Sequence, residues 1–160
     1  MSTPAFTHRN LPGLLLQARE AAMGHFRPGL RGQGLTDQQW RVLRELSAQG
    51  ELDTGSIAIA TQLLGPSLTG VLTRMERNGL VSRWRDPTDA RRSVVQITGL
   101  AQARVQQLSA TIEAHYAASE GTLGKDQLMQ LYTLLDALIA MEQPFANPVN
   151  ATGMLEAVMA

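Results

Sequence analysis

The sequence predicts a mainly α-helical fold that contains one small β-hairpin and forms a single domain. Apolar residues recur at three-to-four spacing through most of the chain, and Gly and Pro residues divide that pattern into segments. Two neighbouring β-prone runs flank a polar turn. The length of 160 residues suits one domain, and the hydrophobic content of 44% is typical of a globular protein.

The N-terminal third of the chain predicts two helices. After ten residues without periodicity, a first helix is expected from four apolar residues at helical spacing: Leu15, Ala18, Ala22 and Phe26. Residues that break helices are then expected to end this pattern: Pro28, Gly29, Gly32 and Gly34. Thr36 and Gln39 stand at the spacing of a capping box. A second helix is therefore expected from there to near Gly50, with one apolar face: Trp40, Leu43 and Leu46.

Two further helices are expected in close succession. One runs from about Thr54 to Gln62, ends at Gly65 and Pro66, and has three candidate buried residues: Ile57, Ala58 and Ala60. Ser67 is the expected N-cap of the next helix. That helix has an apolar stripe with i, i+3, i+4, i+7 spacing: Leu68, Val71, Leu72 and Met75. Its opposite face carries Gly70 among hydroxyls and arginines: Thr69, Thr73, Arg74 and Arg77.

A hairpin and two long helices complete the predicted order. Gly79 stands where a helix C-cap glycine belongs, and the β-prone runs 80–84 and 93–98 follow it. Helices are expected over 100–119 and 125–142. The second of them has a leucine stripe with two apolar neighbours: Leu128, Leu131, Leu135, Leu138, Leu134 and Met141. Residues 143–160 are expected to be a flexible tail with a weak apolar helix from Met154.

The chain is neutral as a whole but charged in its parts. Its 14 Lys and Arg balance its 14 Asp and Glu, yet residues 74–92 hold six arginines against three acids. Residues 99–160 carry six acids and only two cations. Arginine provides 13 of the 14 cations, and its forked guanidinium suits contacts with phosphates and base edges. High-GC codon usage would produce the same arginine bias, so both explanations stay open.

The predicted order of helix, helix, turn, helix and hairpin is that of a winged helix-turn-helix. In such a domain the second helix of the motif enters the major groove of DNA, and the hairpin reaches the backbone or the minor groove. The local positive charge of residues 74–92 lies on these two elements. The sequence therefore predicts a DNA-binding domain. As an alternative, a polar helix face and a charged loop tip are ordinary features of globular proteins.

Two stretches, "LTDQQWRVLRELS" and "PSLTGVLTRMERNGLVSRWRDPTDARRSVVQIT", resemble the MarR family of dimeric bacterial winged-helix transcription factors. The signature residues of that family have counterparts here: Glu76, Gly79, Leu80, Asp89, Arg91, Ile97 and Thr98. The resemblance covers roughly residues 11–142. Within the family, "LLQAREAAM" and "FRP" add a similarity to repressors of homoprotocatechuate-degradation operons.

The resemblance implies a role for several residues. Arg91 would enter the minor groove, and Asp89 would orient it through a charge-assisted hydrogen bond. As an alternative, Asp89 only shapes the turn. Arg92 would partly replace an arginine that many members carry where this chain has Ala90. Further candidates for phosphate and base contacts lie on the fourth helix: Ser67, Thr69, Thr73, Arg74 and Arg77. The last of these can equally be solvated or paired with an acid.

The resemblance also implies a domain organisation and an assembly. The winged-helix lobe would span about 36–98, and the segments 11–34 and 99–142 would provide dimerisation helices. A homodimer would bind a pseudo-palindromic operator as double-stranded DNA. From the residues alone, the apolar stripe of the last helix can equally be buried within one chain.

A small aromatic carboxylate, such as a hydroxylated phenylacetate, is the effector that the narrower similarity implies. Such a molecule needs a cation for its carboxylate and an apolar wall for its ring. The candidate residues are Arg19 for the carboxylate, Met23, Phe26 and Trp40 for the wall, and His25 for a hydroxyl. The alternative is that the apolar residues are plain core and that Arg19 pairs with Glu20 or with an acid across the dimer.

Several other classes of protein fit the sequence poorly. The absence of cysteine excludes disulfides and thiol chemistry, and the three histidines stand apart without a metal-binding or catalytic motif. We therefore expect no enzyme, no cofactor and no metal. No apolar run is long enough to span a membrane, so a cytoplasmic protein without a membrane partner is expected. A winged helix that binds protein, or a regulator of efflux or stress genes with another effector, remains an alternative.

Overall fold

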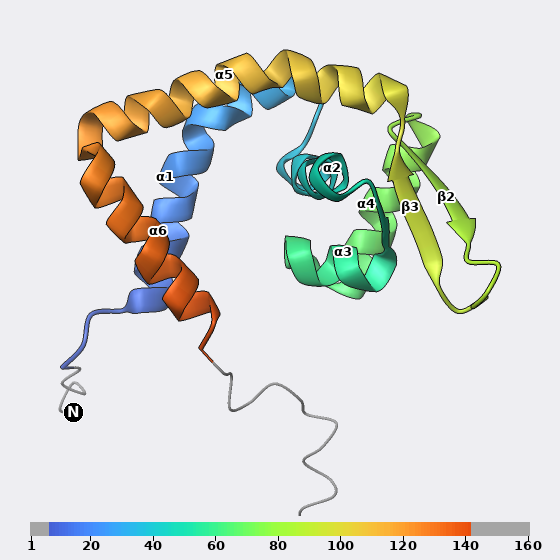
Figure 1. Ribbon diagram of the computed structural model, residues 1–160, viewed down its shortest axis with the longest axis horizontal. Coiled ribbons are helices and arrows are strands. Elements are labelled where there is room, and N and C mark those ends of the chain that lie inside the picture. The colour runs from blue at the N-terminus through green and yellow to red at the C-terminus, as the bar shows by residue number, and fades with distance from the viewer. Residues whose placement is uncertain (1–6, 142–160) are drawn as a thin grey trace, which may run out of the picture. The chain divides into compact units, whose positions relative to one another are not determined.

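The structure is a computed structural model that describes residues 7–141 (Figure 1). It contains the helices α1 (Leu11–Gly32), α2 (Asp37–Gln49), α3 (Thr54–Thr61), α4 (Gly65–Arg77), α5 (Gly99–Leu123) and α6 (Lys125–Ile139). Three strands accompany them: β1 (Glu51–Asp53), β2 (Val81–Arg85) and β3 (Ser93–Ile97). The predicted mainly α fold with a small hairpin is confirmed.

The chain divides into two compact units between Ala117 and Ala118, inside α5. The predicted tail of residues 143–160 lies outside the described residues. Within residues 7–141, no single helix is both long and apolar enough to cross a membrane.

The sheet is antiparallel and has the strand order β1-β3-β2. Strands β2 and β3 form the expected hairpin, with Val81 opposite Ile97 and Arg85 opposite Ser93. We call this hairpin, residues 81–97, the wing. Strand β1 was not expected, because three residues are too short to show an alternating pattern. It pairs with β3 through Leu52 opposite Val95 and so places the start of α3 beside the wing.

The core of the first unit is built by α2, α3, α4 and the sheet. Leu43, Leu46, Ile57, Met75 and Val95 are completely buried. The predicted stripe of α4 is confirmed, because each of its four apolar residues is at most 3% exposed. Burying a side chain of this size stabilises the fold by about 1.5–3 kcal/mol. The apolar stripe thus fixes which face of α4 points outward.

The caps show where sequence prediction succeeds and where it is wrong. The capping box of α2 is confirmed, with Gln39 N donating to Thr36 Oγ1 over 3.2 Å and Thr36 N donating to Gln39 Oε1 over 3.0 Å. The predicted N-cap of α4 is wrong, because α4 begins at Gly65 and Leu64 is its N-cap. Ser67 instead lies exposed within the first turn. A proline early in α4 is compatible with this start, because the N–H groups of the first turn have no acceptor within the helix and none is lost.

Two other predictions need correction. The first helix does not end at Pro28 but continues through it to Gly32. The lost backbone hydrogen bond falls on an exposed residue, and the extra turn buries Leu30, which is 1% exposed. In α3, Ile57 is buried as predicted, but Ala60 is exposed. Thr61 takes the buried position instead and satisfies its hydroxyl by donating to the Ile57 carbonyl over 2.6 Å.

Candidate nucleic-acid interface

The outward face of α4 carries the polar residues that the sequence singled out. Ser67, Thr69 and Thr73 are exposed. The Thr69 hydroxyl donates to the Gly65 carbonyl over 3.0 Å, and the Thr73 hydroxyl donates to the Thr69 carbonyl over 2.8 Å. Each hydroxyl oxygen can therefore still accept a hydrogen bond. The amino groups on the edges of cytosine and adenine can donate to these hydroxyl oxygens. A phosphate cannot, because it offers only acceptors.

The two arginines of α4 are free in the part of the chain that the structure describes. Arg74 and Arg77 are exposed and form no hydrogen bond or ion pair there. A Cβ atom at Gly70 would lie 3.4 Å from Nη1 of Arg74, so the guanidinium lies close over that glycine. The helix thus presents two uncompensated cations on the same side as its hydroxyls.

The tip of the wing, residues 86–92, is an ordered turn. Asp86 N donates to the Arg92 carbonyl over 3.0 Å, and Arg92 N donates to the Asp89 carbonyl over 2.9 Å. The Asp86 carboxylate accepts from the hydroxyl and the backbone N–H of Thr88 over 2.6 and 2.8 Å. These two hydrogen bonds lower the pKa of Asp86 below its ordinary value. These hydrogen bonds within the tip define the local shape of the turn.

Asp89 contacts the backbone of the residue that it was expected to orient. Its Oδ1 accepts from the backbone N–H of Arg91 over 3.0 Å. No hydrogen bond joins it to the Arg91 guanidinium within residues 7–141, and this geometry is that of a turn-forming aspartate. The Arg91 side chain is exposed and has no partner in the same range. Its contact with DNA stays a prediction.

The remaining arginines of the segment are held by other residues. Arg83 donates through Nε and Nη2 to Oε2 of Glu76 over 3.1 and 2.6 Å, which ties β2 to α4. Arg85 donates to the Ala90 carbonyl over 3.3 Å, within the wing. Neither contact was foreseen, because local sequence patterns do not show which face of β2 meets α4.

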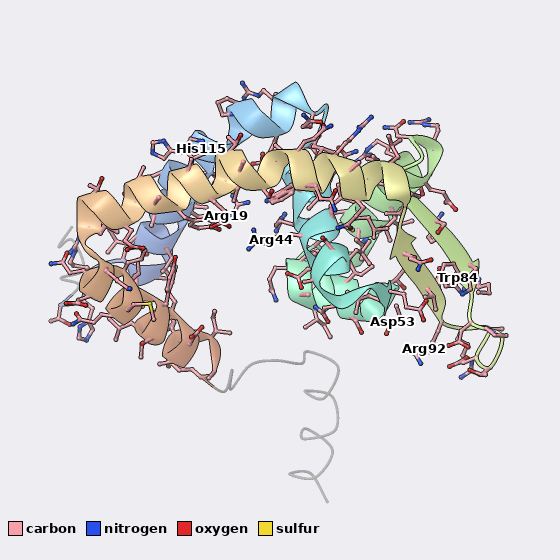
Figure 2. All side chains as sticks on the ribbon, turned by 45° about the horizontal axis from the view of Figure 1, so that its top comes forward. Arg19, Arg44, Asp53, Trp84, Arg92 and His115 are labelled. Carbon is pink, nitrogen blue, oxygen red and sulfur yellow. The ribbon has the colours of Figure 1, made fainter. Side chains whose placement is uncertain are left out.

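Arg92 pairs with two carboxylates, although the sequence suggested a DNA contact. Its Nη2 lies 3.0 Å from Oδ2 of Asp53; Figure 2 labels both residues. Its Nη1 lies 3.9 Å from Oδ2 of Asp86. Asp53 is also the N-cap of α3, where it accepts from Ser56 N over 3.0 Å. The hydrogen bonds from Ser56, followed by that from Arg92, lower the pKa of Asp53 to about 2. The pair raises the pKa of Arg92, chiefly through the hydrogen bond to Asp53.

The residues expected around the effector are only partly brought together. His25 and Phe26 lie against α5, where the ring centroids are 5.9 Å (His25–His115), 5.5 Å (Phe26–His115) and 5.4 Å (Phe26–Tyr116) apart. The ring contacts with α5 join residues about ninety positions apart, which local patterns do not reveal. Met23 and Phe26 pack against the core, and Trp40 is 9% exposed within it.

Arg19 is exposed on α1 and pairs with the neighbouring Glu20 over 2.7 Å (Figure 2). Arg41 of α2 is near enough to feel this charge: burial, and then the positive charge of Arg19, lower the pKa of Arg41. Arg41 donates to the Thr61 carbonyl over 2.6 Å, while its buried Nε has no hydrogen-bond partner among residues 7–141. A surface cavity of about 370 Å³ lies at the end of α1 and the start of α2, and none of the five expected residues lines it. Its lining consists of Arg27, Arg31, Leu35, Thr36, Asp37 and Gln38.

Comparison with known proteins places the chain in a family. A model of the MarR family matches residues 35–93, from just before α2 to the first residue of β3. The homoprotocatechuate degradative operon repressor of Escherichia coli is 41% identical over 134 residues, which cover 84% of this chain and 90% of that protein. The regulator FarR of Neisseria gonorrhoeae is 40% identical over 128 residues and is covered to 88%, with 80% of this chain covered.

The similarity extends to solved structures. NadR in complex with 4-hydroxyphenylacetate superposes with a TM-score of 0.79 at 38% identity, covering 89% of this chain and 100% of NadR. The similarities to the two regulators and to NadR each cover at least 80% of this chain and so extend well beyond the helix-turn-helix and the wing. The chain therefore belongs to the MarR family of dimeric, DNA-binding transcriptional regulators and has their winged helix-turn-helix.

Proposed function

We propose that this chain represses an operon for the degradation of homoprotocatechuate or 4-hydroxyphenylacetate and leaves its operator when a small phenolic carboxylate binds. The observation that carries the proposal is the 41% identity to a homoprotocatechuate degradative operon repressor over 90% of that protein. The similarity of this chain to NadR, which was crystallised with 4-hydroxyphenylacetate, supports the proposed class of effector.

The proposed complex contains two copies of the chain and one pseudo-palindromic operator. Helix α4 enters the major groove, where Ser67, Thr69 and Thr73 face base edges and the α4 arginines face phosphates. The wing reaches the minor groove with Arg91, whose side chain is exposed and unpaired in the described part of the chain. We further propose that residues 36–98 form the DNA-binding lobe and that 11–34 and 99–142 dimerise, with the regulator acting in the cytoplasm.

The effector is proposed to bind near the first helix. The rings around Phe26 supply an apolar and aromatic wall for a phenol. Arg19 and Arg41 lie near each other: after burial, which is the larger cause, the charge of Arg19 lowers the pKa of Arg41, so two cations share this neighbourhood. A carboxylate would be attracted to that charge once Arg19 exchanges Glu20 for the effector. Because the effector releases the DNA, it must bind the free regulator more tightly than the DNA-bound form.

The test is a titration of the operator complex with aromatic acids, followed by fluorescence anisotropy of labelled DNA. 4-Hydroxyphenylacetate is expected to release the operator, and its neutral analogue 4-hydroxyphenylacetamide is expected to do so far less. Arg19→Gln should require at least about tenfold more acid, because it removes a charged partner worth about 1.5–3 kcal/mol. Arg9→Gln, the same change at an exposed residue outside the helices, should behave like the parent protein.

The possible outcomes separate the parts of the proposal. If Arg19→Gln responds like the parent protein, the carboxylate partner is another residue. If no hydroxyphenylacetate releases the operator, the effector class is wrong, and a regulator of efflux or stress genes becomes the better description. If the chain binds no duplex DNA in a salt-dependent manner, the protein-interaction alternative is favoured.

A further inference from the structure

Two adjacent arginines at the end of the wing tip have different surroundings. Arg91 is exposed and has no side-chain partner among residues 7–141. Arg92 is also solvent-accessible, with 54% of its side chain exposed, but it bonds Asp53 and lies near Asp86. One guanidinium is therefore available to a ligand, and the other is already occupied.

The partner of Arg92 lies at a junction of three elements. Asp53 ends β1, is the N-cap of α3, and stands opposite Val94 of β3. Its Oδ2 accepts both the Ser56 hydroxyl, over 2.8 Å, and the guanidinium of Arg92, over 3.0 Å. The pair thus connects the end of the wing tip to the start of α3, 39 residues earlier in the chain.

We propose that Arg92 is a positioning residue, which latches the wing to the N-terminus of α3 through Asp53 and does not itself contact DNA. The proposal rests on the DNA binding proposed above. The latch holds the tip in one place before DNA arrives, so that Arg91 reaches the minor groove without first being ordered. Asp86 assists, because it shapes the turn with Thr88 and faces Arg92 at 3.9 Å.

The competing possibility is that Arg92 leaves Asp53 and bonds a phosphate. That exchange would leave Asp53 close to the DNA without its counter-charge. The two possibilities predict opposite signs for removal of the Asp53 charge. If Arg92 contacts DNA directly, losing a nearby negative charge strengthens binding; if Arg92 is a latch, the same change weakens binding because the wing loses its attachment.

The experiment compares Arg92→Ala, Asp53→Asn, the double variant and Arg91→Ala in operator binding over a range of salt concentrations. Asparagine is a good N-cap, so in Asp53→Asn the amide oxygen can still accept the backbone N–H of Ser56 while the charge is removed. We expect Arg92→Ala and Asp53→Asn each to weaken binding about two- to fivefold, the range for an exposed ion pair, without changing the salt slope. The double variant should be no weaker than either single variant.

The results that would overturn the latch are equally definite. A direct contact would lower the slope of log K against log salt by about 0.9 for each Arg92 removed, as we expect for Arg91→Ala. Tighter binding by Asp53→Asn, or additive losses in the double variant, would also contradict the latch.

A second measurement tests the latch without DNA, so that failure of the proposed function is recognised separately. In the free protein, backbone amide hydrogen exchange in residues 86–93 should be faster in both Arg92→Ala and Asp53→Asn than in the parent protein, and unchanged in Arg91→Ala. Unchanged exchange in the first two variants would refute the latch even if operator binding were normal. Conversely, a parent protein that bound no DNA would refute the proposed function, and the hydrogen-exchange comparison would still show whether the latch exists.

Discussion

Helices α4 and α6 have the same kind of apolar stripe but differ in how far the chain buries it. Of the 13 residues of α4, four are buried: Leu68, Val71, Leu72 and Met75. None of the 15 residues of α6 is buried: in its stripe, Leu131 is 42% exposed, and Leu128, Leu135 and Leu138 are half-buried. A stripe therefore identifies which face is apolar but not what covers it. In α4 the same chain buries the stripe, whereas the stripe of α6 stays partly exposed in the single chain, as a face that a second subunit buries would.

The largest effect is expected in the covered helix. Leu72→Ala should lower the free energy of unfolding by about 2–5 kcal/mol, because the residue is 1% exposed and the change leaves a cavity. Urea denaturation at fixed protein concentration measures this. Thr73→Ala, at the exposed neighbouring position, should change the free energy of unfolding by no more than about 0.5 kcal/mol. A loss below about 1 kcal/mol for Leu72→Ala would contradict the burial of the stripe.

The next effect tests the partly exposed stripe of α6. Leu131→Glu places a charge in the middle of the α6 stripe, so the dissociation constant of the dimer should rise at least about tenfold. Sedimentation equilibrium measures that constant directly. Thr133→Glu adds the same charge on the polar side of the helix and should leave the dimer intact. A Leu131→Glu protein that stays as dimeric as the parent would show that this stripe is not the interface.

A smaller effect is expected at the wing. Arg91→Ala should reduce the slope of log K against log salt by about 0.9 per subunit, because each copy loses one cation that neutralises about one phosphate equivalent in the minor groove. Arg31→Ala removes an exposed arginine from α1 and should leave the slope unchanged. An identical loss of slope in both variants would indicate a general charge effect rather than a contact by Arg91.

The smallest effect concerns pH. The pKa of Asp53 falls from 3.8 to about 2 on folding, so its contribution is complete above pH 3.8 and is lost as the pH falls from there towards 2. In Asp53→Asn the free energy of unfolding should therefore fall less steeply with pH over that interval, while the N-cap of α3 remains. Urea denaturation at several pH values from 5 to 2 is the measurement, and parallel pH profiles for the two proteins would contradict the pKa shift.

The sequence predicted those features that depend on neighbouring residues. The capping box at Thr36, the glycine after α4 with its positive φ of 68°, and the buried face of α4 all depend on local spacing. The start of α4 was misplaced because both Ser67 and the Gly65–Pro66 pair are compatible with a helix start.

The features that were missed depend on residues far apart in the sequence. Strand β1 exists because β3 offers it a partner, not because its three residues favour a strand. The pairing of Arg92 with Asp53 likewise requires β1 to lie beside β3. Sequence reasoning counted all the arginines of residues 74–92 as one positive patch. The structure separates Arg83, Arg85 and Arg92, which have partners within the chain, from the other three, which have none among residues 7–141.

The most direct test of this division is the salt dependence of operator binding by the parent protein. Three arginines per subunit are free of partners within residues 7–141: Arg74, Arg77 and Arg91. If each neutralises one phosphate in a dimeric complex, log K should fall linearly with log salt with a slope of about −5. A slope shallower than about −2 would show that these arginines do not contact the DNA backbone.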